Sequence, residues 1–255
     1  MADKTAPHPD GIHIVKFNEQ WHTYRDNLGS RYVSGTSFIK PFFPKFDAIA
    51  VSKKCAGGNN PLYTGRDPKE IRKEWLVEGK RGSSEGDNTH EYAEWIVSSW
   101  SPDQLPLPIS ARCELLFKQV DKIATWLLLK YKFIEAEKVI FSPSLGIAGM
   151  VDIIFFDPAT QEILILDWKT NKNPLTTINI WQSGFAPIDH LQETDINKYS
   201  LQLSLYQYII EKENYFPEAR GFRRALIHIT PTTVIPIKLD YYKYEIKEML
   251  NETKK

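Results

Sequence analysis

Residues 146–170, GIAGMVDIIFFDPATQEILILDWKT, contain two long apolar runs separated by a polar turn. The runs at 147–157 and 162–169 are too apolar for an exposed surface, and Asp157-Pro158-Ala159-Thr160 between them is a strong turn signal. We therefore expect two strands joined as a hairpin. A third strand is expected just before them, at 134–142. Three consecutive strands of this kind predict the centre of a β-sheet.

Three charged side chains interrupt these apolar strands: Asp152, Asp167 and Lys169. Asp167 and Lys169 point to the same side because alternate residues of a strand share a face, and Asp152 lies in the neighbouring strand. Burying carboxylates among apolar residues is costly unless they are paired or bound to metal. Paired carboxylates suit Mg²⁺ or Mn²⁺, which would lower the pKa of a bound water, while Lys169 would orient or help deprotonate that water and stabilise anionic charge. The alternative is a plain ion pair between Asp152 and Lys169, with Asp167 ending a strand.

Two further elements carry polar residues at helical spacing. His90 stands near the start of an expected helix at 88–98, where a neutral imidazole is a candidate third metal ligand; an ordinary structural histidine is the alternative. Gln202 and Tyr206 share one face of an expected helix at 195–214. They are candidates to hydrogen-bond a nucleic-acid backbone or to brace the lysine, and an ordinary half-buried helix is again the alternative.

The remaining segments predict a single α/β domain over 1–255, without an internal repeat or linker. Alternating residues over 11–40 predict a β-hairpin that turns at Asp26-Asn27-Leu28-Gly29. The polar, glycine-bearing residues 81–87 are expected to separate two helices, the first of which has Asp67 as its N-cap. In full, we expect helices at 47–55, 68–80, 88–98, 109–131 and 195–214, short strands at 223–230 and 233–239, and a helix at the C-terminal end.

Composition favours a soluble globular protein. The 255 residues include 32 basic and 32 acidic side chains, and this net charge of zero argues against a general basic coat for duplex DNA. Basic clusters at 53–54, 66–81 and 220–224 are candidates to contact phosphate, although such clusters are more often solvated faces. Two cysteines, no apolar signal core and no apolar run of about 20 residues lead us to expect a cytoplasmic protein that does not enter membranes.

The polar elements stand in the order Gly-x-x-x-His, Gly-x-x-Asp, Asp-x-Lys and Gln-x-x-x-Tyr. This order resembles the RecB-like branch of the PD-(D/E)xK nucleases, which includes mitochondrial and viral exonucleases. The resemblance covers about residues 13–230, and the matching residues are Gly86, His90, Gly149, Asp152, Asp167, Lys169, Gln202 and Tyr206. It implies a restriction-endonuclease-like α/β fold, in which a central mixed β-sheet is flanked by helices, with an N-terminal β-hairpin and a helical insertion.

The resemblance also implies roles for single residues. Lys169 would act on the attacking water, and Glu137 would be the carboxylate of the preceding strand that often supports such a site, with Glu135 as the competing register. The implied ligands of Mg²⁺ or Mn²⁺ are His90, Asp152, Asp167 and the main-chain carbonyl of Trp168, and the implied nucleic-acid contacts are Gln202, Tyr206, Thr170 and Lys198. Residues 68–130 are the candidate for an arch that threads a single strand, and 134–240 are the expected catalytic core.

The expected activity is that of a metal-dependent DNA exonuclease that hydrolyses phosphodiester bonds in recombination, repair or replication, and that favours single strands or free ends. An endonuclease on duplex DNA or RNA and a non-catalytic nucleic-acid-binding subunit are the alternatives. A helicase, a recombinase and a single-strand-binding protein are candidate partners. A phage or virus is the expected source, so that the cytoplasm would be the host's. Two cysteines exclude a four-cysteine iron–sulfur cluster, and no phosphate-binding loop of a motor is present.

Overall fold

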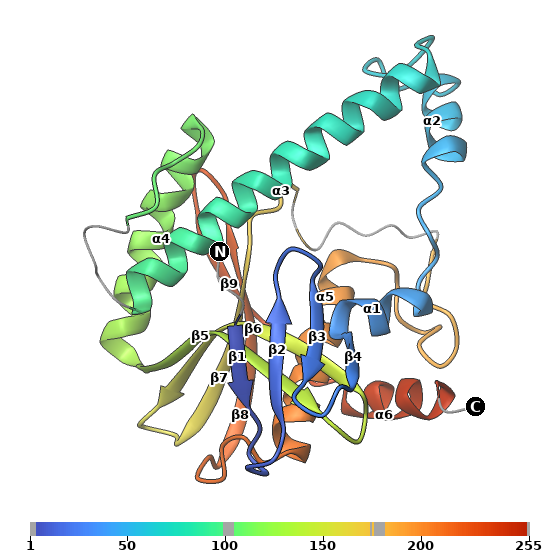
Figure 1. Cartoon of the computed structure of the whole chain (residues 1–255). Coiled ribbons are helices and arrows are strands. Elements are labelled where there is room, and N and C mark those ends of the chain that lie inside the picture. Colours follow the sequence, from blue (N-terminus) through green and yellow to red (C-terminus); the bar gives the residue numbers. More distant parts are fainter. Residues whose placement is uncertain (1–3, 99–104, 174, 176–181, 254–255) are drawn as a thin grey trace.

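The computed structural model describes residues 4–98, 105–173, 175 and 182–253. Within these residues a nine-stranded mixed sheet forms the centre, in the order β1-β2-β3-β4-β6-β7-β8-β9, with β5 paired to β6 off this path (Figure 1). The strands are β1 (Lys4–Pro7), β2 (Ile14–Asn18), β3 (Thr23–Asp26), β4 (Arg31–Ser34), β5 (Lys132–Ser142), β6 (Ile147–Asp157), β7 (Glu162–Lys169), β8 (Gly221–Ile229) and β9 (Val234–Lys238). The helices are α1 (Gly35–Ile39), the short 3-10 helix η1 (Lys40–Phe42), α2 (Ala48–Ala56), α3 (Pro68–Ser98), α4 (Ala111–Lys130), α5 (Asp195–Lys212) and α6 (Lys243–Glu252).

Strands β5, β6 and β7 form the consecutive antiparallel pairs that the apolar runs predict. The carboxylate of Asp157 accepts the backbone N–H of Ala159 at 2.9 Å, and this contact closes the expected turn between β6 and β7. The other neighbours of β6 and β7 are parallel: β4 pairs with β6, and β8 pairs with β7. The predicted α/β class, a central mixed sheet flanked by helices, is therefore confirmed.

Helices cover both faces of the central strands, which explains why these strands are apolar throughout. In β7, Ile163 and Ile165 belong to the core cluster that contains the buried residues of α5 and α6. Leu164 and Leu166 belong to the opposite cluster, with α3 and α4. Asp167 continues the row of Ile163 and Ile165, so its side chain is directed toward α5 at the end of the strand.

Helix α3 is one continuous helix of 31 residues, and the break expected at 81–87 is wrong. A helical glycine costs about 1 kcal/mol relative to alanine, which is why Gly82 and Gly86 suggested an interruption. Tertiary contacts outweigh this cost. Glu85 is buried and accepts hydrogen bonds from Ser110 and Arg112 at the start of α4. The first half of α3 projects away from the sheet together with α2 (Figure 1), whereas its second half and α4 pack on the sheet.

The N-terminal strands extend the sheet further than expected. The hairpin between β3 and β4 turns where predicted: the N–H of Asp26 donates to the carbonyl of Ser30, and Gly29 has the positive φ of 91° that such a turn needs. Strand β1 was not expected, because it is only four residues long and has little apolar character. It pairs antiparallel with β2. Among the described residues, no helix is both long and apolar enough to cross a membrane.

Candidate active site

Asp152, Asp167 and His90 converge from two strands and one helix. Ile153 pairs with Leu166 across β6 and β7, and this register places Asp152 beside Asp167. The backbone N–H of Trp168 donates to Oδ2 of Asp152 at 3.0 Å. Nδ1 of His90, on α3, lies 3.4 Å from the same oxygen. The structure thus places His90 in contact with Asp152, and Asp167 next to Asp152 on the adjacent strand.

Asp167 and Lys169 form a buried ion pair, and Asp167 is only 3% exposed. Burial and the nearby charge of Asp152 together raise the pKa of Asp167 to about 6, although the ammonium group of Lys169 opposes this rise. Burial would by itself lower the pKa of Lys169, but the carboxylates of Asp167 and Asp152 raise it above its ordinary value. Nζ of Lys169 also lies 4.6 Å from the ring centre of Tyr199 on α5, within the range of a cation–π contact. Lys169 is therefore a fixed cation at the end of β7.

The donor set fits a divalent metal ion. Two carboxylates and one imidazole are ligands that Mg²⁺ or Mn²⁺ accepts in hydrolytic sites. Burial is the main reason that the pKa of Asp167 is raised, and the like charge of Asp152 adds to it; a bound cation would offset both effects. The residues that would hold it are His90, Asp152 and Asp167, while a contribution from the Trp168 carbonyl stays a prediction.

Glu137 stands on the third strand of this arrangement. Ala136 pairs with Ile153 and Lys138 with Val151, so Glu137 lies across from Asp152. Its backbone has a positive φ of 47°, and its carboxylate forms an ion pair with Lys4 of β1. Glu135, the competing candidate, instead pairs with Lys138 at 2.6 Å. The register therefore favours Glu137 as the supporting carboxylate, a role that stays a prediction.

Gln202 and Tyr206 lie beside this site on α5, and the amide of Gln202 donates to the Tyr206 hydroxyl at 3.2 Å. Tyr206 is 4% exposed. A methyl group added to Gly149 would lie 2.2 Å from Cε1 of its ring, and one added to Gly35 would lie 2.7 Å from the same atom. Burial argues against direct contact between Tyr206 and a nucleic acid, and its ring packs against Gly149 and Gly35; the aromatic ring that contacts Lys169 is that of Tyr199. Gln202 is half-buried and remains a candidate for such contact.

A groove runs beside the lysine, between the segment that follows α1 and the start of α5. Gln202 and Tyr199 line it, so it reaches the contact between Tyr199 and Lys169. Its basic and aromatic lining residues are Lys40, Lys45, Lys198, Phe43, Phe46 and Tyr199. Lys198 lies over the ring of Phe43, 5.4 Å from its centre, and also pairs with Glu193 at 2.7 Å. The predicted nucleic-acid contact Lys198 thus lies in a groove that combines lysines and aromatic rings with two carboxylates, Glu193 and Asp195.

Thr170, another predicted nucleic-acid contact, follows β7 directly and also joins helices to the sheet. Its carbonyl accepts a hydrogen bond from Arg112 of α4 at 2.7 Å, and Arg112 in turn pairs with the buried Glu85 of α3 at 3.2 Å. A methyl group on Gly86 would lie 3.3 Å from the Thr170 hydroxyl, so glycine permits this close approach. The sequence analysis missed Arg112 and Tyr199; the spacing of Tyr199 three residues before Gln202, on the same helix face, was an available signal for the latter.

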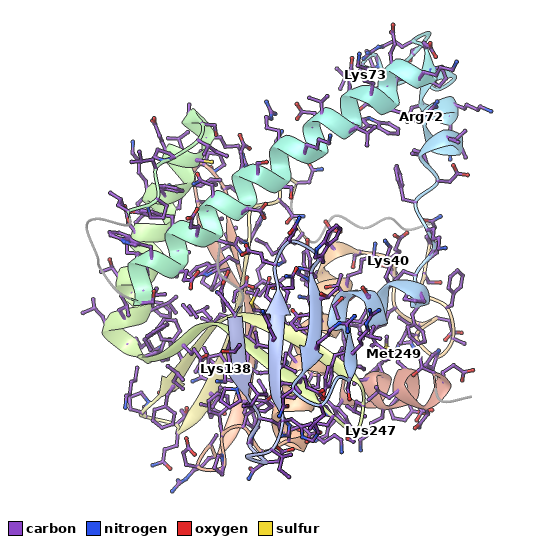
Figure 2. All side chains as sticks on the ribbon, viewed as in Figure 1. Lys40, Arg72, Lys73, Lys138, Lys247 and Met249 are labelled. Carbon is purple, nitrogen blue, oxygen red and sulfur yellow. The ribbon has the colours of Figure 1, made fainter. Side chains whose placement is uncertain are left out.

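Several arginines of the basic clusters are engaged in internal contacts. Arg66 pairs with Glu74, and Arg72 donates to the hydroxyl of Ser52 at 2.7 Å. Arg223 pairs with Asp157 and Glu162. Figure 2 shows Arg72 and Lys73 at the projecting end of α3, far from the strands that carry Asp152 and Asp167. Lys40 lies beside α1, at the groove described above.

Comparison with known proteins identifies the class to which this fold and site belong. Residues 64–254 match the family model of the PD-(D/E)XK nuclease superfamily, and the chain belongs to this superfamily. Among solved structures, it is similar to a crystal structure from Eubacterium rectale described as a "putative exonuclease", with 12% sequence identity, a TM-score of 0.35, and coverage of 88% of this chain and 78% of that chain. A search of curated proteins found no match. The chain is therefore a nuclease of a superfamily that uses divalent metal ions.

Proposed function

We propose that this protein is a Mg²⁺- or Mn²⁺-dependent deoxyribonuclease that degrades DNA from a free end and prefers single strands. The observation that carries the proposal is the meeting of Asp152, Asp167 and His90 beside the fixed cation of Lys169, in a chain of a nuclease superfamily. The order of the motifs supports the RecB-like branch, and recombination, repair or replication of DNA, in a phage or virus, as its setting.

The side chains have distinct parts in phosphodiester hydrolysis. Asp152, Asp167 and His90 would hold the metal, and a bound divalent cation would supply Lewis-acid stabilisation of the phosphate. The N–H of Trp168 fixes the carboxylate of Asp152 at 3.0 Å, so this ligand does not have to reorganise when substrate arrives. Lys169 stays protonated, which suits it to orient the attacking water and to stabilise the charge that develops on the phosphate oxygens.

The groove beside Lys169 supports a preference for unpaired bases. Stacking on aromatic rings requires a base that is not paired, and each stacked base contributes about 1–3 kcal/mol. Phe46 is 69% exposed in this groove, and Lys40 and Lys45 offer charge for the phosphates, while Lys198 is paired with Glu193. A local basic groove is also compatible with the net charge of zero. A strand bound there would have its backbone near Lys169.

Digestion of single strands with and without ends tests the proposal. End-labelled linear DNA and a closed circle of the same sequence are incubated with the protein in Mg²⁺, in Mn²⁺ or in a chelator. We expect either metal to support loss of the linear strand, the circle to stay intact, and the chelator to stop the reaction. Asp167→Ala prepared in parallel controls for contaminating nucleases.

Two results would overturn the exonuclease. Cleavage of a closed circle, whether of single-stranded DNA, duplex DNA or RNA, would make the protein an endonuclease. Binding of linear DNA without cleavage in any metal would make it a non-catalytic subunit. A helicase, recombinase or single-strand-binding protein remains the kind of partner that would present a free strand to this site.

A further inference from the structure

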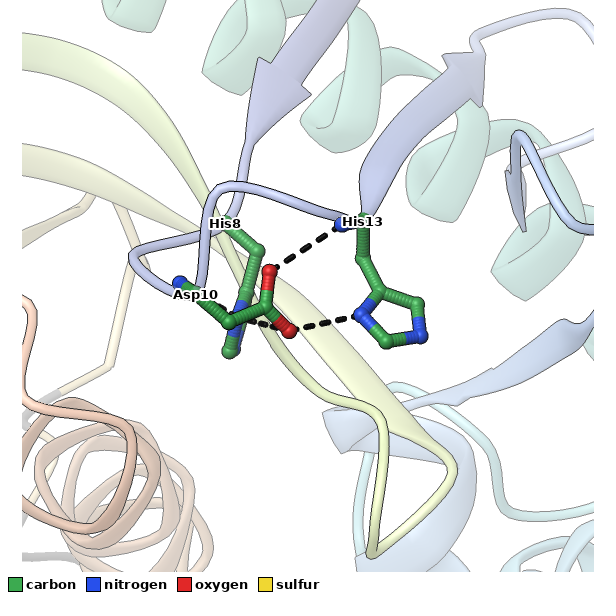
Figure 3. Close-up of side chains that lie close together, drawn as sticks. All are labelled: His8, Asp10 and His13. Atoms are coloured by element: carbon green, nitrogen blue, oxygen red, sulfur yellow. Dashed lines mark hydrogen bonds and ion pairs between the residues drawn. The ribbon is translucent and has the colours of Figure 1, made fainter.

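The loop between β1 and β2 brings together three side chains that commonly bind metals: His8, Asp10 and His13 (Figure 3). One ligand atom from each lies within 4.8 Å of the other two. Oδ2 of Asp10 is 3.0 Å from Nδ1 of His8 and 2.6 Å from Nδ1 of His13. In a tetrahedral zinc site with bonds of about 2.0–2.1 Å, ligand atoms stand roughly 3.3 Å apart. The spacing of His8 and Asp10 is near this value, whereas the contact of Asp10 with His13, a hydrogen bond in this structure, would have to open to admit the ion.

His8 and Asp10 approach each other closely enough to bind one cation together. Nδ1 of His8 accepts the backbone N–H of Asp10 at 3.2 Å. The same nitrogen lies 3.0 Å from a carboxylate oxygen of Asp10. In the tautomer that carries its proton on Nε2, the lone pair of Nδ1 faces this oxygen, and a metal ion would satisfy His8, Asp10 and His13 together.

The second ring nitrogen of His8 is placed as in a metal-bound histidine. Nε2 lies 3.5 Å from Oε2 of Glu213 and has no hydrogen-bond partner among the described residues, although the side chain is only 3% exposed. Histidines that bind metal through one nitrogen usually direct the N–H of the other toward a carboxylate, which fixes the ring. Glu213 is itself held by the hydroxyl of Ser142. A small movement of His8 would complete this arrangement.

We propose that His8, Asp10 and His13 bind one Zn²⁺ ion, with Glu213 as the carboxylate that orients His8. Two imidazoles and one carboxylate suit Zn²⁺ better than Mg²⁺, which prefers oxygen ligands. The site is separate from the active site: it follows the end of β1, whereas Lys4 at the start of that strand pairs with Glu137. The ion would fasten the loop between β1 and β2 to the residues that follow α5.

The test measures how much zinc is bound by a variant that lacks the two carboxylates of the candidate active site. The Asp152→Ala/Asp167→Ala variant is stripped with a chelator and dialysed against Zn²⁺ alone, and the bound zinc is measured by elemental analysis. We expect one zinc per chain and a higher melting temperature with zinc than without it. Adding His13→Ala should remove both effects. Adding His190→Ala, which changes an exposed histidine paired with Glu245, should remove neither.

Two further variants keep the test independent of folding. Asp10→Asn retains an oxygen to accept the N–H groups of Ile12 and His13 but loses the charge, so zinc should bind at least about tenfold more weakly. Glu213→Gln should weaken zinc binding by about 10- to 100-fold without abolishing it. Circular dichroism checks the fold of each variant. The proposal fails if the stripped protein binds no zinc, or if His13→Ala and Asp10→Asn bind it as the parent does.

Discussion

The ring of Tyr206 on α5 occupies the space that a side chain at Gly149 on β6 would need. A methyl group at position 149 would lie 2.2 Å from Cε1 and 2.7 Å from Cζ of the ring, closer than atoms can approach without movement. The Gly-x-x-Asp and Gln-x-x-x-Tyr motifs are thus two halves of one contact between strand and helix. Asp152 follows three residues after Gly149, so this contact also helps to set the position of a metal ligand.

Gly149→Ala should therefore destabilise the protein and lower its activity. Overpacking of a filled core costs about 1–3 kcal/mol, because the strand or the ring must move. We expect a loss of this size in the free energy of unfolding, measured in urea, and a loss of nuclease rate beyond the unfolded fraction, since a shift of β6 would displace Asp152.

A double-mutant cycle tests whether Tyr206 is the residue that a side chain at position 149 would clash with. Tyr206→Ala alone should cost about 3–5 kcal/mol through the cavity that it leaves. If the clash is the cause, adding Gly149→Ala to that variant should cost much less than it costs in the wild type. Equal costs in both backgrounds would show that Tyr206 is not the obstacle.

The catalytic carboxylate and lysine give the next prediction. Asp167→Ala and Lys169→Ala should each lower the cleavage rate by roughly 10²-fold or more, because one removes a metal ligand and the other the fixed cation beside it. Both variants should retain the wild-type circular dichroism spectrum and remain folded in the assay. Single-turnover cleavage at saturating metal measures the effect, and near-full activity of either variant would disprove the assignment.

Gln202→Ala should have a milder effect than either of these changes. Its amide donates to the Tyr206 hydroxyl at 3.2 Å and it lines the groove, so its hydrogen bond is to a neighbouring side chain and not to a proposed metal ligand. The loss of one neutral hydrogen bond is worth about 0.5–1.5 kcal/mol, which corresponds to roughly a 2- to 12-fold change. A loss as large as that of Asp167→Ala would instead place Gln202 in the reaction itself.

Residue patterns predict the parts of this fold in which local signals agree. The apolar runs around Asp152 and Asp167, with the turn at Asp157, specify strands β6 and β7 because length, periodicity and turn chemistry point to one structure. The continuity of α3 was not predictable in this way, since Gly82 and Gly86 disfavour a helix locally. The buried contacts of Glu85, which stabilise it, join residues more than 20 positions apart.

The candidate site, like the fold, has features that the sequence predicts and features that it does not. Asp152 and Asp167 lie on adjacent strands that the sequence defines, so their approach was predictable, whereas the approach of His90 from α3 was implied only by the family resemblance. The choice between Glu135 and Glu137 was not, because an irregularity in the pairing of β5 with β6 shifts the register between Phe133 and Glu135. The sequence also does not reveal that Tyr206 packs on Gly149, because the two residues lie on different elements. The Gln-x-x-x-Tyr motif is equally compatible with contact to a nucleic acid.

The groove beside Lys169 leads to a prediction about substrate binding. Phe46→Ala should weaken binding of single-stranded DNA by about 5- to 150-fold, the equivalent of one stacked base, while duplex binding changes less. Tyr244→Ala is the matched control, because Tyr244 on α6 is equally exposed, at 69%, but lies outside the groove. Fluorescence anisotropy with Asp167→Ala protein and a labelled oligonucleotide measures both. Equal effects of the two variants would show that the groove does not bind the strand.

The turn between β3 and β4 provides a pH-dependent prediction for stability. Asp26 accepts hydrogen bonds from the N–H groups of Leu28 and Ser30 at 3.0 and 2.8 Å and from the hydroxyl of Tyr32 at 2.8 Å. Burial opposes ionisation of Asp26, but these hydrogen bonds outweigh it and hold its pKa below the ordinary value. A carboxyl group with a lowered pKa in the folded state stabilises the protein above the pKa of the unfolded chain. This contribution is lost as the pH falls through about 4 and below.

Asp26→Ala should consequently cost about 1–3 kcal/mol at pH 7, and the difference from the wild type should shrink as the pH is lowered from 5 toward 2. Tyr32→Phe, which removes a single one of these hydrogen bonds, should cost less at pH 7 and serves as the comparison. Urea denaturation at a series of pH values measures both variants. If the cost of Asp26→Ala were the same at pH 7 and pH 3, the ionised carboxylate would not be what stabilises this turn, and its oxygen atoms alone would account for the hydrogen bonds.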